Sequence, residues 1–328
     1  MELTVIAKNL HAQYLLFSLP LLLLLGCSKP ANGLPQAAAR ETQYCASRGL
    51  LLQTLGTGGP IAEGHRAGSS NLVWIDGKAR LLIDAGPGLF LRYGEAMADF
   101  NDLDAVLTTH AHGDHVGGLP GLFNSGSFAQ RQRALTLIGP KGDASFAGPA
   151  QLRDRLIGAN GALPYLKGFV DGSEEKPMLQ IAEIDAKKTG LQPVWRSDGV
   201  EVDAIAVHHG PVPALAYILR YQGQMIIFAG DQSFMSEDFV TILKNSRPDI
   251  LVMHNVISMA AGQPRGLHRD GTSIGEAAAA INPKKLLLTH NMKRALDDGP
   301  AVMAAIRSSY KGTIEMANDL DCFAVGRD

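Results

Sequence analysis

The stretch that decides the fold of this chain is Ala105-Val106-Leu107-Thr108-Thr109-His110-Ala111-His112-Gly113-Asp114-His115. A strand-like apolar run is followed at once by four side chains that can bind a metal ion, namely His110, His112, Asp114 and His115. Side chains two residues apart on an extended segment point to the same side, and Gly113 lets the backbone turn the next pair toward the same point. Imidazole and carboxylate groups suit a borderline divalent ion such as zinc. We therefore predict two adjacent metals at the end of this strand, rather than a solvated polar loop.

A site for two metals needs more donors than one turn supplies, and the sequence has them at the ends of three later apolar runs. His208-His209-Gly210 follows residues 200–207, Gly230-Asp231 follows residues 225–229, and Thr289-His290 follows residues 286–288. Each position alone is more often a polar strand end whose hydrogen bonds are satisfied. Together with the first turn, they complete a ligand set that a scaffold can present into a cleft.

Short apolar runs and helical stretches alternate from Gly49 onward, which predicts an α/β fold of two sheets packed face to face with helices outside. Helices are expected at residues 151–157 and 272–280; Thr272 or Ser273 would cap the second, with Glu276 completing the capping pattern. Residues 149–168 could form a flap over the site. The expected strands are residues 50–55, 71–75, 80–83, 105–108, 135–138, 200–207, 216–221, 225–229, 250–252 and 286–288.

Composition points to one large catalytic domain with an export segment. The chain has 328 residues, of which 46% are hydrophobic and 19% charged. That supplies a sizeable core and argues against long disordered stretches. A net charge of -2 predicts no strong attraction to nucleic acid or to an anionic membrane.

The N-terminus carries a second signal. Residues 14–25 are almost wholly apolar and the run ends in Leu24-Leu25-Gly26-Cys27. About a dozen apolar residues are too few to cross a bilayer as a helix, which takes roughly 20, and they suit the core of a signal peptide. The ending resembles a bacterial lipobox, which implies a lipid on Cys27, and Ser28 after it resembles the pattern of outer-membrane lipoproteins. An ordinary signal peptide cleaved near Ala31 is the alternative.

Both readings predict an exported, periplasmic protein, with the lipobox reading placing it on the outer membrane through Cys27. We divide the chain into a signal peptide at 1–27, a linker at 28–48 and a hydrolase domain at 49–328. Cys45 and Cys322 would be the remaining thiols, and an oxidising periplasm would allow them to pair. Spacing alone cannot place them within bonding distance, so the sequence leaves their pairing open.

A series of short motifs resembles the metallo-β-lactamase superfamily, and most closely its tRNase Z and arylsulfatase-like branch. The motifs follow one another in order from residue 50 to residue 290, and only the export segment and residues 301–328 fall outside them. They are Leu55-Gly56-Thr57-Gly58-Gly59, Leu82-Ile83-Asp84-Ala85-Gly86, the metal-binding turn with Gly118-Leu119-Pro120, Gly139-Pro140-Lys141-Gly142, His209-Gly210-Pro211, Ala229-Gly230-Asp231 and Leu288-Thr289-His290. The resemblance implies a four-layer αββα sandwich.

The resemblance also implies roles for the site residues. One zinc would be held by His110, His112 and His209, and a second by Asp114, His115 and His290, with Asp231 bridging the two. We favour His209 over His208 because the family's ligand stands immediately before the glycine.

Four further positions bear on the same resemblance. His268 resembles the proton-donating histidine of tRNase Z, and we predict His268 and Asp114 as the catalytic residues. Asp84 resembles the family's carboxylate that orients metal-site groups, with a simple turn aspartate as the alternative. At His254 and Asn255 family members often have His-Glu, so Asn255 departs from the pattern. His65 and Arg66 could contact an anionic substrate, although a solvated loop is the better reading.

The predicted reaction is hydrolysis of a small sulfate or phosphate ester by a metal-bridging hydroxide, with two Zn²⁺ and with Mn²⁺ or Fe²⁺ as possible substitutes. A genuine tRNase Z normally inserts a long basic arm between the third histidine and the bridging aspartate, and the stretch from Tyr217 to Gly230 leaves room only for a hairpin. The predicted partner is therefore a small-molecule ester, and nucleic acid is not expected. The alternatives are a carboxylic ester or lactone hydrolase, a tRNase Z-like phosphodiesterase, and a metal-binding lipoprotein without turnover. The sequence does not indicate an oligomeric state.

Overall fold

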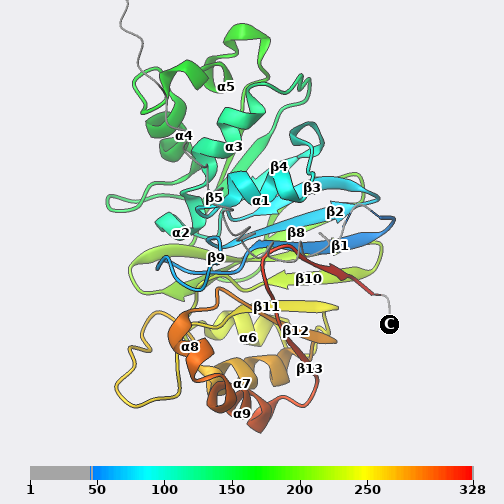
Figure 1. The fold of residues 1–328 in the computed structure, drawn as a ribbon, viewed down its shortest axis with the longest axis vertical. Coiled ribbons are helices and arrows are strands. Elements are labelled where there is room, and N and C mark those ends of the chain that lie inside the picture. Colours follow the sequence, from blue (N-terminus) through cyan, green and yellow to red (C-terminus); the bar gives the residue numbers. More distant parts are fainter. Residues whose placement is uncertain (1–44, 46, 327–328) are drawn as a thin grey trace, which may run out of the picture. The chain divides into compact units, whose positions relative to one another are not determined.

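The histidine-rich turn follows the end of an inner strand of the first sheet, which faces a second sheet (Figure 1). The structure is a computed structural model that describes residue 45 and residues 47–326. In that part of the chain both sheets have seven strands. In order across the first sheet these are β14 (Asp321–Ala324), β1 (Leu50–Gly56), β2 (Ser70–Ile75), β3 (Lys78–Ile83), β4 (Ala105–Leu107), β5 (Thr136–Pro140) and β6 (Gln180–Ile184). Across the second they are β13 (Thr313–Met316), β12 (Lys285–Thr289), β11 (Ile250–His254), β10 (Gln224–Phe228), β9 (Val212–Tyr221), β8 (Val200–His209) and β7 (Gln192–Ser197).

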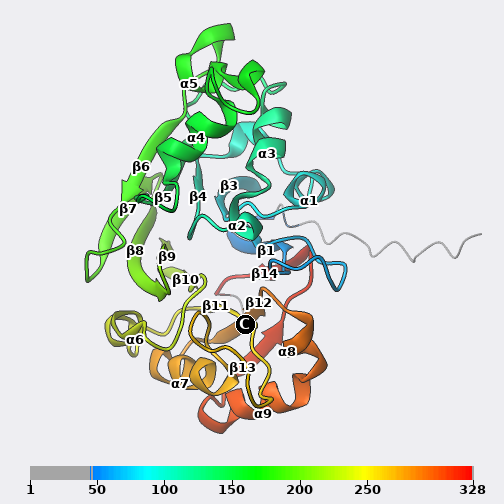
Figure 2. The ribbon, with the colours of Figure 1, turned by 90° about the vertical axis from the view of Figure 1, so that its left-hand side faces the viewer.

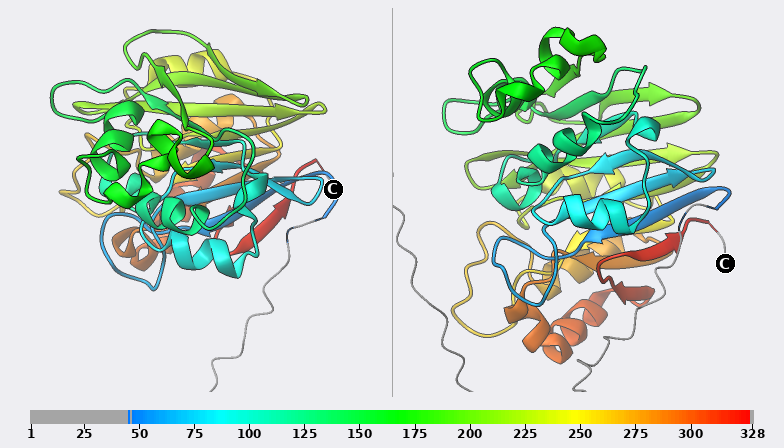
Figure 3. Two further views of the ribbon diagram at one scale, coloured as in Figure 1. Left: turned by 90° about the horizontal axis from the view of Figure 1, so that it is seen from above. Right: turned by 45° about the horizontal axis from the view of Figure 1, so that its top comes forward.

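Helices cover the outer face of each sheet, as Figure 2 and Figure 3 show from two further sides. The first sheet carries α1 (Leu89–Glu95), α3 (Leu119–Gly126), α4 (Pro149–Ile157) and α5 (Gly168–Asp171), and the second α6 (Glu237–Leu243), α7 (Gly271–Ile281) and α9 (Gly299–Ser309). The shorter helical pieces are η1 (Phe100–Asp102), α2 (Gly113–Val116), η2 (Pro164–Leu166), η3 (Ser173–Glu175) and α8 (Lys293–Asp297). The predicted αββα sandwich is thus confirmed.

Alternation along the strands explains why this sequence makes layers. In β1, Leu50 and Leu52 belong to the cluster between the two sheets, whereas Leu51 and Leu55 belong to the cluster under the helices. Because side chains on a strand point alternately to opposite faces, a strand with leucines on both faces must be covered on both sides. All seven residues of β1 are buried.

Parallel pairing brings the strand ends together. In the first sheet β3 runs parallel to β4, with Ile83 opposite Leu107. In the second, β10, β11 and β12 are parallel neighbours, with Phe228 opposite Val252 and His254 opposite Thr289. Loops at the carboxyl ends of parallel strands meet at one edge of a sheet, which is where such folds present their functional groups.

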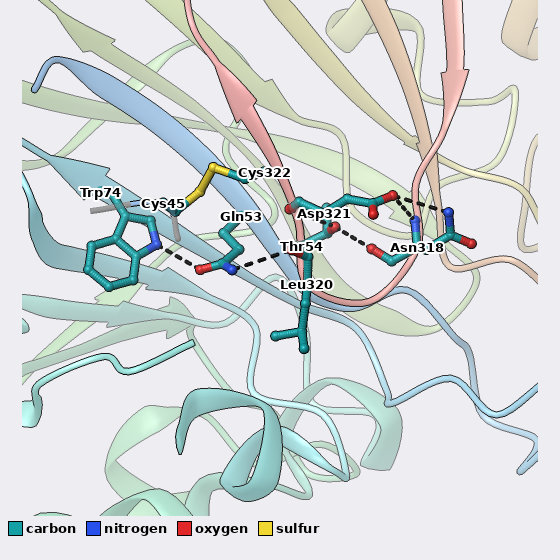
Figure 4. Close-up of a disulfide and its surroundings, with 8 residues drawn as sticks. All are labelled: Cys45, Gln53, Thr54, Trp74, Asn318, Leu320, Asp321 and Cys322. Carbon is teal, nitrogen blue, oxygen red and sulfur yellow. Dashed lines mark hydrogen bonds between the residues drawn. A yellow bond between two sulfur atoms is a disulfide. The ribbon is translucent and has the colours of Figure 1, made fainter. Parts of the chain in front are cut away.

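A disulfide joins the segment that precedes β1 to β14, the edge strand that pairs with β1 in the first sheet (Figure 4). Cys45 forms a disulfide with Cys322 of β14, with 5.8 Å between their Cα atoms, a separation typical of disulfides. The bond lies beside Gln53, which accepts a hydrogen bond of 3.0 Å from the Trp74 indole. The pairing that the sequence leaves open is therefore formed in the structure.

Two local predictions are wrong. Helix α7 begins at Gly271, and its cap is Asp270, whose carboxylate accepts a hydrogen bond of 2.9 Å from the Ser273 amide, in place of the predicted Thr272 or Ser273. Residues 149–168 do not form a flap, because Ile157 and Leu166 are buried in the core under the first sheet. Residues 301–328, outside the motifs, supply most of α9 and all of β13 and β14.

The predicted signal peptide, the lipid-modified Cys27 and the linker through residue 44 lie outside the described residues. Among the residues that are described, no helix is both long and apolar enough to span a membrane.

Candidate metal centre

The histidine-rich turn is presented by β4 and closed by the short helix α2. His110 and His115 are fully buried, Asp114 is 8% exposed, and His112 stands at the N-terminal cap of α2. The turn faces the second sheet, from which His209 enters at the end of β8 and Asp231 three residues beyond the end of β10. The two sheets therefore contribute to one cluster.

The first group of donor atoms comes from His110, His112, His209 and Asp231, and these atoms all lie within 4.8 Å of one another. Nδ1 of His112 is 3.0 Å from Nε2 of His110 and 3.3 Å from Nε2 of His209. Oδ2 of Asp231 is 3.7 Å from the first of these Nε2 atoms and 3.5 Å from the second. All four residues are among those predicted from the sequence.

The second group comes from His115, His254, His290 and Asp231. His254 takes the place in this group that the sequence assigned to Asp114. Oδ2 of Asp114 nevertheless lies 3.0 Å from Nε2 of His290 and 3.5 Å from Nε2 of His115. Asp231 belongs to both groups and lies between them.

The spacing of these atoms fits metal ions. Two ligands about 2.0–2.1 Å from a tetrahedral metal are roughly 3.3–3.4 Å apart. Oδ2 of Asp231 has three imidazole nitrogens at 3.5 to 3.7 Å, those of His110, His115 and His209. In addition, Nε2 of His115 is buried and has no hydrogen-bond partner among the described residues. A buried polar atom normally has a partner, so this one is consistent with a ligand position.

The second ring nitrogen of three histidines is hydrogen-bonded, which fixes how each ring points. Nδ1 of His110 is 3.1 Å from the Thr109 hydroxyl, and Nδ1 of His209 is 3.0 Å from the Leu267 carbonyl. Nδ1 of His115 donates to Asp84 at 2.8 Å. Such outer contacts orient metal-binding histidines, and Asp84 makes the contact that its predicted orienting role requires.

Two of these residues hold a backbone conformation that is uncommon for side chains other than glycine. Asp84 has φ 62° and His290 has φ 51°. A left-handed conformation costs roughly 1–2 kcal/mol in an ordinary residue, and such positions cluster at functional sites. Here each one turns a strand-end side chain toward the cluster.

The cluster keeps its carboxylates ionised. Burial works against a charge on Asp231, but His290 and His115 hold the pKa of this carboxyl well below its usual range. Burial also opposes ionisation of Asp114, while the hydrogen bond from His290 lowers the pKa of Asp114 to about 2. Burial and the neighbouring His115 hold the pKa of His110 well below its usual value. Ionised carboxylate and neutral imidazole are the forms that bind a metal. Burial opposes a charge on His115, but Asp84 and Asp231 hold its pKa well above the usual value, so this ring would have to lose a proton on binding a metal.

A cavity of about 640 Å³ opens onto the cluster, within the range of small-molecule sites, about 300–1,000 Å³. Its walls include Ile61, Leu267 and His268 together with His112 and Asp114. Nδ1 of His268 lies 3.6 Å from Oδ1 of Asp231, and burial lowers the pKa of His268 to about 4. The structure thus brings both predicted catalytic residues to the cavity.

Other sequence candidates lie outside the cluster. His208 belongs to neither group of donor atoms, and its Nδ1 is 2.8 Å from the Ser233 hydroxyl. His65 is exposed. Arg66 borders the cavity, but its guanidinium donates to the Thr57 hydroxyl and to the Ala317 carbonyl. The prediction of a solvated loop therefore holds for His65, whereas Arg66 is half-buried and bonded within the fold.

The sequence did not predict that His254 lies in the site. The sequence motifs give His254 no role, yet this residue ends β11 between the strands that present Asp231 and His290. The signal that could have identified His254 is that it ends a buried apolar run, as the residues near Asp231 and His290 also follow such runs.

Comparisons with known proteins agree with this geometry. Residues 50–298 match the family model described as anti-Pycsar protein Apyc1. A ribonuclease Z of Mycolicibacterium paratuberculosis is 32% identical over 291 residues, which cover 81% of this chain and 95% of that protein. The metallo-β-lactamase fold protein YhfI of Bacillus subtilis superposes with a TM-score of 0.64 at 18% identity, covering 84% of this chain and 99% of its own. The short form of human tRNase Z gives 0.61 at 18% identity, covering 84% and 100%.

Proposed function

The chain belongs to the anti-Pycsar protein Apyc1 family and is a metal-dependent ester hydrolase of the tRNase Z branch of the metallo-β-lactamase superfamily, and from this premise we propose that it is an exported dinuclear enzyme that cleaves small phosphate esters. The observation that carries the proposal is Asp231, whose carboxylate lies between two groups of donor atoms. Membership of a hydrolase family leaves the alternative of a lipoprotein without turnover unsupported.

In this proposal, His110, His112 and His209 hold one ion, and Asp114, His115 and His290 hold the other, with Asp231 bridging. Zinc is the expected metal because the donors are imidazole and carboxylate, with Mn²⁺ or Fe²⁺ as substitutes. When bound, two such ions supply a nucleophile from water at neutral pH and positive charge for the phosphate oxygens. The chain's own residues fix the positions and the charges of the donors.

Asp114 and His268 are the proposed catalytic residues because they border the same cavity. The depressed pKa of Asp114 keeps its carboxylate ionised, so it can bind a metal and accept a hydrogen bond from the attacking water. The His268 ring lies 5.1 Å from the ring of His209, and its Nδ1 is 3.6 Å from Oδ1 of Asp231, so we place it at the cavity edge of the first group, where it would contact the leaving group. Ile61 and Leu267 give the cavity an apolar wall for the organic part of an ester.

Two observations favour a small substrate over tRNA. The cavity volume suits a small molecule. Between His209 and Asp231 the chain forms only the hairpin of β9 and β10, which turns at Gln222 and Gly223, where a tRNA-holding arm would be inserted. A tRNase Z-like activity is the second candidate, because a ribonuclease Z is 32% identical over most of its length.

Export and attachment to the outer membrane through a lipid on Cys27 are part of the proposal. The disulfide between Cys45 and Cys322 supports it, since structural disulfides persist in oxidising compartments such as the periplasm. The test of this part is mass spectrometry of the processed N-terminus. A diacylglycerol-modified Cys27 supports the anchor, cleavage near Ala31 supports export alone, and an unprocessed Met1 contradicts both.

The reaction is tested with zinc-loaded protein on a substrate panel. We expect turnover of bis(p-nitrophenyl) phosphate, and slower or no turnover of p-nitrophenyl sulfate, p-nitrophenyl acetate and a lactone. Cleavage of a tRNA precursor alone would favour the second candidate, and preference for the sulfate or the acyl esters would replace the phosphate assignment. If no substrate reacts while two metals are bound, the proposed function fails.

A further inference from the structure

We infer that His254 is a positioning residue that holds the bridging carboxylate of Asp231, and that it is not itself a metal ligand. The inference rests on the metal assignment in the proposed function. Nδ1 of His254 lies 2.5 Å from Oδ1 of Asp231. A carboxylate can only accept, so Nδ1 must carry the proton and donate it.

The distance separates this contact from those of the ligands. Two donors on one tetrahedral ion are roughly 3.3–3.4 Å apart, whereas a charge-assisted hydrogen bond from nitrogen to a carboxylate is about 2.7–2.9 Å. The 2.5 Å contact of His254 is far below the first spacing and is therefore a hydrogen bond. His290 and His268 approach the same oxygen at 3.7 Å and 3.6 Å. Only the approach of His254 is a direct bond, with no room for an ion between the two atoms.

The fold gives His254 little freedom. It is the last residue of β11 and pairs with Thr289 of β12, so it stands beside the residue that precedes His290. Its ring stacks on the His290 ring with 4.6 Å between centroids and 22° between planes, and its side chain is 6% exposed. A buried, stacked ring at a strand end holds its hydrogen bond in one direction.

The consequence is that Asp231 cannot turn. His254 fixes Oδ1, and Oδ2 is left facing His110, His115 and His209 at 3.5 to 3.7 Å. Loss of the His254 bond would let the carboxylate rotate and would weaken both metal sites together. Loss of a true ligand would weaken one site and leave the other.

The experiment compares His254→Ala, His254→Gln and His254→Asn in the full-length chain. Asparagine places an amide nitrogen near the position of Nδ1, whereas glutamine places it near Nε2. Zinc affinities are measured by competition with a chromophoric chelator, and the cobalt-substituted proteins are compared by visible absorption. His208→Asn is the matched control, since this histidine neighbours a proposed ligand but bonds to Ser233.

We expect the alanine and glutamine variants to lose about 10–100-fold in affinity at both sites, the range seen when outer partners are removed. The asparagine variant should recover most of that loss with a near-normal cobalt spectrum, and the control should match the parent. Loss of one metal equivalent in all three variants, with the other site unchanged, would make His254 a ligand and overturn the inference. Unchanged affinity in the alanine variant would also overturn it.

If the alanine variant does not fold, the difference between the asparagine and glutamine variants decides the question. Metal binding is read without turnover, so a failure of the phosphate-ester proposal would leave this test intact.

Discussion

The two sheets supply the metal site in opposite ways. The first sheet gives His110, His112, Asp114 and His115 from one turn after β4. The second gives His209 from the end of β8, and Asp231, His254 and His290 from the ends of three parallel strands that are far apart in sequence. A local cluster is fixed by the conformation of a few residues. A dispersed one depends on the register of a whole sheet, and Asp231 is where the two meet.

Replacing Asp231, the residue shared by the two groups of donor atoms, should have the largest effect on metal binding and activity. Replacement by alanine should reduce bound zinc from about two per chain to below one, and should slow phosphate-ester cleavage by about 10³-fold, since a metal-supplied charge is worth several kcal/mol and each 1.4 kcal/mol is about tenfold. Elemental analysis and initial rates measure the two effects. Asp297→Ala, an exposed carboxylate on α8, is the control and should change neither. Two zinc per chain in the Asp231 variant would refute the bridging role.

Separate loss of one ion is the next largest effect. His112→Ala should remove the ion of the first group, and His290→Ala should remove the ion of the second group. Each variant should keep about one zinc, and titration with a chelator should show which affinity is lost. If His112→Ala and His290→Ala each release both ions, the two groups act as one site, and the assignment of two separate metal sites is wrong.

The sequence predicted that His110, His112, Asp114 and His115 lie together, because these residues are close in the chain and their geometry is local. It also predicted the layered fold, since runs such as residues 50–55 are apolar on both faces. It did not place His254 in the site, because only the pairing of β10, β11 and β12 brings that residue to Asp231. The cap of α7 was misplaced for a smaller reason: Asp270, Thr272 and Ser273 are all good caps, and the choice depends on where the helix begins.

The disulfide is a further difference between the two sheets, because it stabilises the edge strand β14 of the first sheet. Cys45→Ser with Cys322→Ser should lower the free energy of unfolding by about 2–5 kcal/mol. For a domain of this size each kcal/mol is about 2–4 °C, so we expect the melting temperature to fall by roughly 4–20 °C. Zinc content should stay the same. An unchanged melting temperature by differential scanning calorimetry would mean that the hydrogen bonds between β1 and β14 suffice.

The smallest expected effect concerns Asp102 in η1, on the first sheet and away from the metal groups. Burial and the nearby Asp99 raise the pKa of Asp102 above its usual value. A raised carboxyl pKa means that the folded state disfavours the charge, so the protein gains stability from this group as pH falls and loses it as pH rises through the raised value. Asp102→Asn should therefore stabilise the protein by at most about 0.5 kcal/mol at pH 7.

That difference should vanish below the unfolded-state pKa of about 3.9. Urea unfolding of both proteins at pH 7 and pH 3.5 measures it. A benefit that is equal at both pH values would show that charge is not its cause.

The disulfide has a consequence for how the protein withstands proteases. Cys45 and Cys322 are 277 positions apart, so nearly the entire described chain lies inside one covalent ring. A single cut in any loop of that ring opens the polypeptide but releases no fragment. Each sheet keeps its strands, and the two halves of the metal site, one from each sheet, stay on the same molecule until the disulfide is reduced.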